Sequence, residues 1–306
     1  MTQKENNIVL FSITLCWASS YIFIKDLPEN LSSYAYLTLT TGIAAILLLA
    51  IFFKRLHKID GSTILRSFIL ALLMTGDLLA EKAGLATLPS SNASFIASLN
   101  ILFVPVLLLL FHQKPSRNNV AGMMIILLGL LITSNFHLDG FYNSGTLYML
   151  AGCVFMAFYT ILASEFTKKS DPLSIGILQI VFTAVIGFGL WFLEEPRTFA
   201  TLTYSRQMLS SIFILAFFTK AYAYIMLMYS EQYASAFRVT VIASTEPVVT
   251  LGLALMIPNA FGQTESFQPR ALVGAVCIAV GAVVAGTDFL SHRQKKEGEK
   301  CEVNAR

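Results

Sequence analysis

The sequence predicts an all-α membrane protein whose chain crosses the bilayer ten times, as two inverted repeats of five helices. Three observations lead to this fold class. Apolar residues make up 56% of the 306 residues and charged residues only 13%, whereas soluble proteins have about 25% charged residues. The apolar residues gather in ten runs, each near the ~20 residues that a spanning helix needs. A pattern of proline and glycine in the first half of the chain also returns in the second half.

Short loops separate the ten runs and hold most of the basic residues. The net charge of +3 therefore says nothing in favour of nucleic acid as a partner, and the lipid bilayer is the expected surrounding of nearly the whole chain. We expect the helices near residues 8–25, 32–53, 64–84, 91–111, 118–136, 145–165, 173–193, 208–229, 234–256 and 270–290.

The basic residues predict the orientation of the chain. Ten spans put both termini on one side, where fourteen Lys and Arg residues would lie against five on the other side. The positive-inside rule then places both termini in the cytoplasm, so we expect a multi-pass protein of the plasma membrane. The larger group is Lys4, Lys54, Arg55, Lys58, Arg66, Lys114, Arg117, Lys168, Lys169, Arg293, Lys295, Lys296, Lys300 and Arg306, and the smaller group is Lys25, Lys82, Arg197, Arg206 and Arg270.

The first and fourth runs each carry a polar group at depth. Residues 17–21 read WASSY, and Trp17 and Ser20 share a helical face that either packs against a neighbour or lines a cavity. The fourth run starts at a turn that caps it, with Asn100 and Pro105 near its middle.

Two acids mark the third run. Asp77 and Glu81 are four residues apart and so share one face of a helix. We expect Glu81 and the following Lys82 at the solvated outer end of the helix, and Asp77 deeper. Two like charges on one face are unfavourable unless they are paired, hydrated or protonated.

In the second half, the sixth run carries Tyr159 and the eighth carries Lys220, with Tyr224 one turn further on. Lys220 lies in the middle of its run, too far from either surface for its charge to reach water easily. It therefore needs a partner, which could be Glu246, Asp77 or a carboxylate of a substrate.

The ninth run is the most polar, with Arg238, Thr245, Glu246 and Pro247. Arg238 lies near the predicted cytoplasmic end and could be either an anchor that reaches the surface or part of a site. Glu246 lies deeper, where it either pairs with a structural cation or serves a site. A charge at bilayer depth costs at least ~2.5 kcal/mol, so it favours a functional interpretation.

A repeat links the two halves. When Pro105 is set on Pro247, glycines spaced by seven follow in both halves, and this register places Glu246 on Val104. Each proline should break its helix, since it cannot donate a backbone hydrogen bond. Five spans per repeat is an odd number, so the second repeat enters the membrane from the opposite side. We expect repeats at residues 1–140 and 141–290 and a charged cytoplasmic tail at 291–306. The glycines are Gly122 and Gly129 in the first half and Gly274 and Gly281 in the second.

The WASSY segment, the mid-run prolines and the duplicated glycine spacing together resemble the EamA-type family of the drug/metabolite transporter superfamily. The resemblance covers about 280 of the 306 residues. It implies export of amino acids and related metabolites. The family's acidic residue after the fourth and ninth spans has no counterpart after the fourth run here, where residues 112–114 read HQK.

Inverted repeats typically hold a substrate near the membrane midplane between the two halves. We therefore expect a secondary transporter of a small zwitterionic or amphipathic metabolite that works by alternating access, as an exporter. Asp77 and Glu246 are candidates for carrying a coupled proton. The residues expected to bind substrate are Trp17, Ser20, Asp77, Asn100, Tyr159, Lys220, Tyr224, Arg238, Thr245 and Glu246.

Two other functions fit the sequence less well. A flippase for lipids or carrier lipids would need a basic headgroup pocket, whereas the expected charges at depth are of both signs. A membrane-embedded enzyme needs a nucleophile with a base, or a metal site. We expect no catalytic residue, metal or cofactor, and the oligomeric state stays open. The four histidines all fall in loops or in the tail, at His57, His112, His137 and His292.

Overall fold

The computed structural model describes residues 1–28, 30–110, 116–133, 143–202, 204–257 and 269–286, and all regular structure in these ranges is helical. The first half contains α1 (Gln3–Lys25), α2 (Ser33–Phe52), the short 3-10 helix η1 (Phe53–Lys58), α3 (Gly61–Leu85), α4 (Ser90–Ala97), α5 (Asn100–Leu110) and α6 (Arg117–Thr133). The second half contains α7 (Ser144–Phe166), α8 (Pro172–Glu194), α9 (Thr198–Thr201), α10 (Arg206–Ile214), the π-helix η3 (Leu215–Tyr222), α11 (Ala223–Tyr233), α12 (Ala236–Ala243), α13 (Glu246–Met256) and α14 (Pro269–Gly286).

These helices occupy the ten predicted runs and confirm the fold class. In the described part of the chain, eight helical stretches are long and apolar enough to cross a membrane. Shorter apolar helices over Arg117–Ile132 and Leu272–Ala285 fill the fifth and tenth runs. The predicted boundary between residues 140 and 141 and the predicted tail at 291–306 lie outside the described residues.

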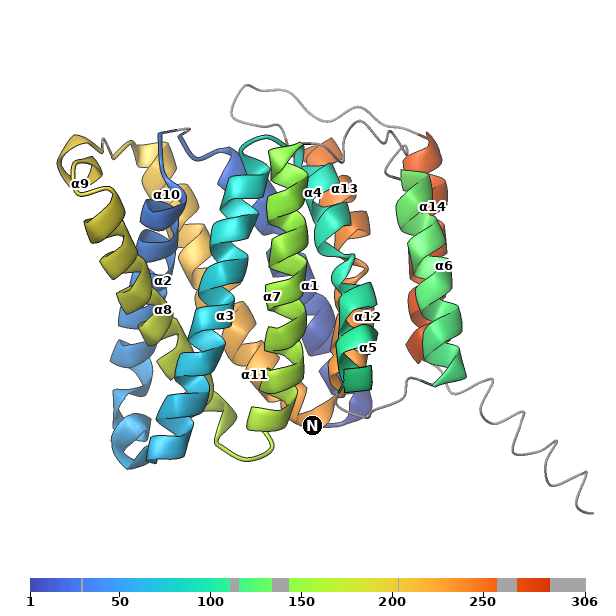
Figure 1. Ribbon diagram of the computed structural model, residues 1–306, viewed down its shortest axis with the longest axis horizontal. Helices are drawn as coiled ribbons and strands as arrows, with labels where there is room; N and C mark the ends of the chain where they lie inside the picture. The colour runs from blue at the N-terminus through green and yellow to red at the C-terminus, as the bar shows by residue number, and fades with distance from the viewer. Residues whose placement is uncertain (29, 111–115, 134–142, 203, 258–268, 287–306) are drawn as a thin grey trace, which may run out of the picture.

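The two halves run in opposite directions through the bundle. At one end of α3, the Thr87 hydroxyl donates to Asn143 Oδ1 (3.0 Å), immediately before α7. At the other end, Arg66 Nη1 donates to the carbonyl of Lys169 (3.2 Å), just after α7. Helices α3 and α7 are therefore antiparallel, whereas α1 and α3 are parallel (Figure 1). The first helix of each repeat thus enters from the opposite face, as an inverted repeat requires.

Helix starts follow from side-chain caps. Ser32 and Ser235 each accept a hydrogen bond from the backbone N–H three residues on, at 3.2 and 3.3 Å. Asp60 caps α3 in the same way, outside the apolar span. Hydrogen bonds from the hydroxyls of Ser62 and Thr63 lower the pKa of Asp60 to about 2. Such caps satisfy donors that the membrane would otherwise leave unpaired.

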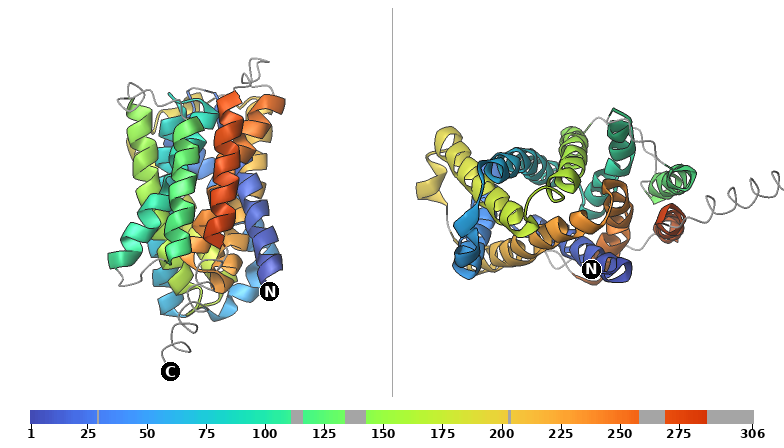
Figure 2. Two further views of the ribbon diagram at one scale, coloured as in Figure 1. Left: turned by 90° about the vertical axis from the view of Figure 1, so that its right-hand side faces the viewer. Right: turned by 90° about the horizontal axis from the view of Figure 1, so that it is seen from below.

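The last helices of the two repeats, α6 and α14, pack on each other at one end of the bundle (Figure 2). A Cβ atom added at Gly122 would lie 2.6 Å from the carbonyl oxygen of Gly281, and one at Gly129 would lie 2.7 Å from that of Gly274. The two backbones approach closely because neither side carries a side chain there. The glycine spacing that defined the repeat is therefore a packing feature.

Two spans break at equivalent points, and these points correct the register inferred from the prolines. Helices α4 and α12 both have eight residues, α5 and α13 both have eleven, and the breaks fall at residues 98–99 and 244–245. The backbone bonds match as well: Leu99 N–H donates to Ile96 (2.9 Å), and Thr245 N–H donates to Ile242 (3.1 Å). Residue 100 therefore corresponds to residue 246. The proline-based register was wrong by one helical turn.

The two prolines, each predicted to break its helix, lie at different places relative to the breaks. Pro105 lies inside α5, since one missing backbone bond can be tolerated within a membrane helix. Pro247 lies at the start of α13, where its missing N–H would have no helical partner in any case.

Hydroxyl groups accompany both breaks. Ser98 Oγ donates to the carbonyl of Ser94 (3.0 Å), and Ser244 Oγ donates to that of Val241 (2.6 Å). Serine bonds of this kind compete with the helical backbone pattern and bend helices. The breaks thus share a serine rather than a proline.

Candidate functional site

A cavity opens between the repeats at the level of both helix breaks. It is lined by α1 and α3 of the first repeat, by α7, η3 and α11 of the second, and by residues at the two breaks. It leaves about 70 Å³ for the centres of water-sized molecules, several times the ~10–15 Å³ that one water needs. Buried apolar residues lie one or two helical turns from the cavity toward the end of the bundle that holds the N-terminus, among them Ile13, Met74, Ala163 and Leu227.

Three acids line this cavity. Asp77 and Glu81 come from one face of α3, as their spacing predicts, and Glu246 is the first residue of α13. The Ser20 hydroxyl lies 3.4 Å from Glu81 Oε1, and the hydroxyl of Tyr21 contacts Glu246. The start of a helix stabilises an acid through the helix dipole.

Lys220 is the cation of the cavity and is only 2% exposed. Its ammonium lies 5.7 Å from the ring centroid of Tyr36 and 5.9 Å from that of Tyr224. It interacts electrostatically with Glu81 and Asp77. Within the described residues, however, no carboxylate oxygen lies within the 4.0 Å of an ion pair. The electrostatic partners of Lys220 are thus Glu81 and Asp77. Glu246 instead contacts the hydroxyl of Tyr21.

A π-helix places Lys220 in the cavity. In η3 the backbone bonds skip to the fifth residue, as from Ala223 N–H to the carbonyl of Phe218. The wider turn shifts side chains relative to an α-helix, and such turns are frequent at functional sites. The sequence carries no proline or glycine at this place that could have predicted it.

Aromatic rings form one wall. Tyr224 packs against Trp17 with ring centroids 5.6 Å apart, and against Tyr159 at 5.8 Å. The Tyr159 hydroxyl is bonded to Gln179 Oε1 (3.0 Å) and lies behind this wall. The rings therefore fix the position of Tyr224 beside Lys220.

Seven of the ten residues predicted to bind substrate line the cavity, and three do not. Tyr159 lies behind Tyr224, and the hydroxyl of Thr245 is bonded to the carbonyl of Ile242 (2.7 Å). Arg238 lies near the N-terminal end of α1, where the Gln3 side-chain oxygen, in its better orientation, accepts from both guanidinium nitrogens at 2.9 and 2.5 Å. The seven are Trp17, Ser20, Asp77, Asn100, Lys220, Tyr224 and Glu246. Their role in binding stays a prediction.

Sequence reasoning missed several cavity residues. Glu81 was expected at a solvated helix end together with Lys82, but Glu81 lines the cavity and Lys82 is only 9% exposed. The spacing of Glu81 from Asp77 was the available signal. Cys153 also lines the cavity, and its thiol donates to the carbonyl of Ile96 (3.0 Å).

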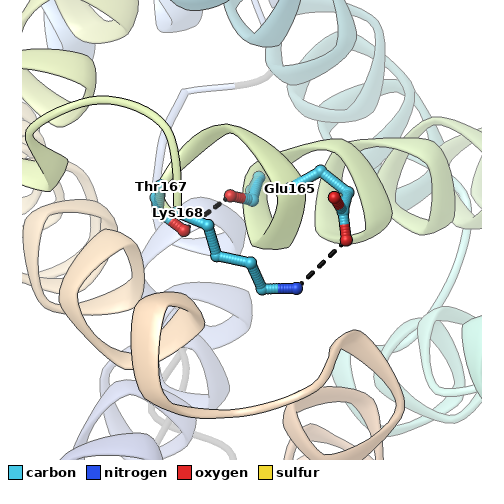
Figure 3. A network of polar contacts seen from close by, with 4 residues as sticks. Glu165, Thr167 and Lys168 are labelled. Atoms are coloured by element: carbon cyan, nitrogen blue, oxygen red, sulfur yellow. Dashed lines mark hydrogen bonds and ion pairs between the residues drawn. The ribbon is translucent and has the colours of Figure 1, made fainter.

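A further acid, Glu231, lies away from the cavity and is fully buried in α11. Neither of its carboxyl oxygens has a hydrogen-bond partner among the described residues. At the C-terminal end of α7, Glu165 and Lys168 form an ion pair one helical turn apart, with Oε1 and Nζ separated by 3.0 Å (Figure 3). Glu231 follows the eighth run in a polar stretch, where sequence alone gave no reason to expect burial.

An inverted repeat with a polar cavity between its halves is the architecture of many membrane transporters. The chain belongs to the EamA-like transporter family, whose sequence profile matches residues 6–135 and 143–287. Two proteins of Archaeoglobus fulgidus, each named an uncharacterized transporter, are similar to it. One is 30% identical over 84% of this chain and 90% of its own, and the other is 25% identical over 89% and 82%.

The fold is also known from a solved structure. A protein of known crystal structure superimposes with a TM-score of 0.71, over 93% of this chain and 98% of its own, at 17% sequence identity. At that identity the similarity concerns the fold alone.

Proposed function

We propose that the protein is a secondary transporter that moves a small zwitterionic or amphipathic metabolite, such as an amino acid, by alternating access around the cavity. The observation that carries this proposal is the cavity itself, which lies between inverted repeats and holds acids and a lysine at depth. Charged groups are costly in a membrane interior and are found mostly where they serve substrates or ions. Export is the direction that the family resemblance favours.

The test is counterflow in proteoliposomes that contain the purified full-length protein. Liposomes loaded with unlabelled compound would be offered labelled amino acids, nucleosides or cationic drugs. Accumulation of a labelled amino acid above the protein-free control is the expected result. Absence of counterflow for every compound would contradict the proposal, and uptake limited to labelled lipid would indicate a flippase.

We also propose that both termini face the cytoplasm of the cell and that the protein lies in the plasma membrane. In support, Arg66, Lys168 and Lys169 lie at the same end of the bundle as the N-terminus. A membrane-impermeant thiol reagent applied to intact cells should leave Cys301 unlabelled, although this residue lies outside the described part of the structure. Rapid labelling of Cys301 would reverse the orientation.

A further inference from the structure

The cavity contains more negative than positive side chains, and this excess bears on the substrate. Asp77, Glu81 and Glu246 face a space in which Lys220 is the cationic side chain. Lys220 can balance one of the three acids, and its electrostatic partners are the two on α3. A bound ligand therefore meets at least one acid that no protein cation compensates, unless the acid binds a proton.

A hydrogen-bond acceptor in the cavity, on Asn100, also lacks a donor among the described residues. Asn100 is 8% exposed, and its Oδ1 atom has no hydrogen-bond partner in the described part of the chain. Ser20, a potential donor, already donates to the carbonyl of Trp17 at 2.7 Å. An unpaired buried acceptor is unfavourable, so the site favours a ligand that donates N–H groups.

The aromatic wall is suited to the same kind of ligand. Cations bind favourably over the faces of tryptophan and tyrosine, and Lys220 already lies near the face of Tyr224. Trp17 is packed against the same tyrosine and lines the cavity. Acids, an unpaired amide oxygen and aromatic faces thus surround one space.

We propose that the cavity selects organic cations, that is, amines with a net positive charge such as diamines or amino acids with a basic side chain. The acids on α3 and Glu246 bind the ammonium groups, and Asn100 accepts one of their N–H bonds. This inference rests on the proposed transport function and changes its substrate class from zwitterions in general to compounds with a net positive charge. A carboxylate on the ligand is tolerated only beside Lys220, so a net-neutral amino acid binds more weakly.

The test compares compounds with nearly the same carbon chain in counterflow at neutral pH. Lysine has a net charge of one, its decarboxylated diamine cadaverine has two, norleucine is net neutral, and hexanoate is an anion. A charge-assisted hydrogen bond is worth about 1.5–3 kcal/mol, or roughly tenfold or more in affinity. We expect half-saturation for lysine and cadaverine at roughly tenfold lower concentration than for norleucine, and no exchange of hexanoate.

The outcomes separate the two proposals. If norleucine exchanges as well as lysine, the charge selectivity is overturned while transport of amino acids stands. If none of these compounds exchanges, but a nucleoside or another neutral metabolite does, the cationic substrate class is overturned while transport itself stands. Failure of every compound overturns both.

Variants test the residues directly. Glu81→Gln should lower the ratio of lysine to norleucine transport several-fold, whereas the same change at the exposed Glu165 is the matched control and should leave the ratio unchanged. Asn100→Asp should have the opposite effect and raise the ratio of lysine to norleucine transport, because it adds an acid to the cavity. The start of α5, where residue 100 lies, stabilises a negative charge. If both cavity variants leave the ratio at the wild-type value, Glu81 and Asn100 do not determine the selectivity for the charge of the ligand.

Discussion

The two broken spans, α4–α5 and α12–α13, have helices of the same lengths and different chemistry. The backbone bonds donated by residues 98, 99 and 102 correspond to those donated by residues 244, 245 and 248. At the first residue after the break, however, one has the neutral Asn100 and the other the acidic Glu246, and both line the cavity. The comparison teaches that the repeat conserves the shape of the break while each half supplies its own polar group.

The variant with the largest expected effect tests whether Lys220 of the second half and the acids of the first half stabilise each other. Lys220→Met leaves Asp77 and Glu81 without a buried cation. Removal of one member of a buried ion pair costs about 3–5 kcal/mol, which is an upper limit here because no acid lies within 4.0 Å of Lys220 among the described residues. We expect the free energy of unfolding in detergent micelles to fall by up to that amount, and transport to be lost.

The pairing is tested with second changes. Lys220→Met combined with Glu81→Gln should be more stable than Lys220→Met alone, and more stable than its combination with Glu246→Gln. Glu165→Gln is the control, because the pair of Glu165 with Lys168 lies at the surface and such pairs are worth about 0–1 kcal/mol. Equal stability of the single and both double variants would exclude Glu81 as the partner.

The next test contrasts the two prolines, which the sequence alignment treated as equivalent. Pro105→Ala restores a bond within α5, where an interior proline costs an ordinary helix about 3 kcal/mol. We expect it to raise the free energy of unfolding by about 1–3 kcal/mol. Pro247→Ala acts at a helix start, where proline costs little, and should change stability by less than about 1 kcal/mol. If both variants changed the free energy of unfolding equally, the two prolines would be equivalent, as the proline-based register requires.

A third test concerns the acid at the second break. If Glu246 carries the coupled proton, a pH difference of one unit supplies about 1.4 kcal/mol per proton and accelerates transport by the wild type. Glu246→Gln should abolish that acceleration, and Asp77→Asn should weaken it less. The measurement is the initial transport rate with and without the gradient, with Glu165→Gln as the control. Full gradient dependence in both cavity variants would assign coupling elsewhere.

The smallest effect is expected at Arg238, which the structure places at the end of the bundle beside Gln3. Arg238→Gln removes a contact near the surface, where such interactions are worth about 0–1 kcal/mol. Half-saturation and maximal rate in counterflow should both stay within roughly twofold of the wild type. A tenfold or larger change in either quantity would indicate that Arg238 belongs to the binding site.

Sequence reasoning found the ten spans because long apolar runs are a strong signal that the bilayer imposes locally. It found most of the charged cavity residues because a charge within such a run is rare. It misplaced the first break because it took proline as the marker, whereas the backbone bond pattern changes at residues 98 and 99. It misjudged Glu81 because depth along a helix does not show which neighbour covers the side chain, and Arg238 because the approach of α1 is a tertiary contact.

The glycine contact between α6 and α14 has a consequence for biosynthesis. The glycine face of α6 is made in the first half of the chain, but its partner α14 is the last described helix to leave the ribosome. Since small residues on a membrane helix gain stability only when another backbone approaches them, this face stays without its native contact until α14 is inserted. The first five spans therefore cannot complete their own packing, and the contact on α6 forms only after α14 has been inserted.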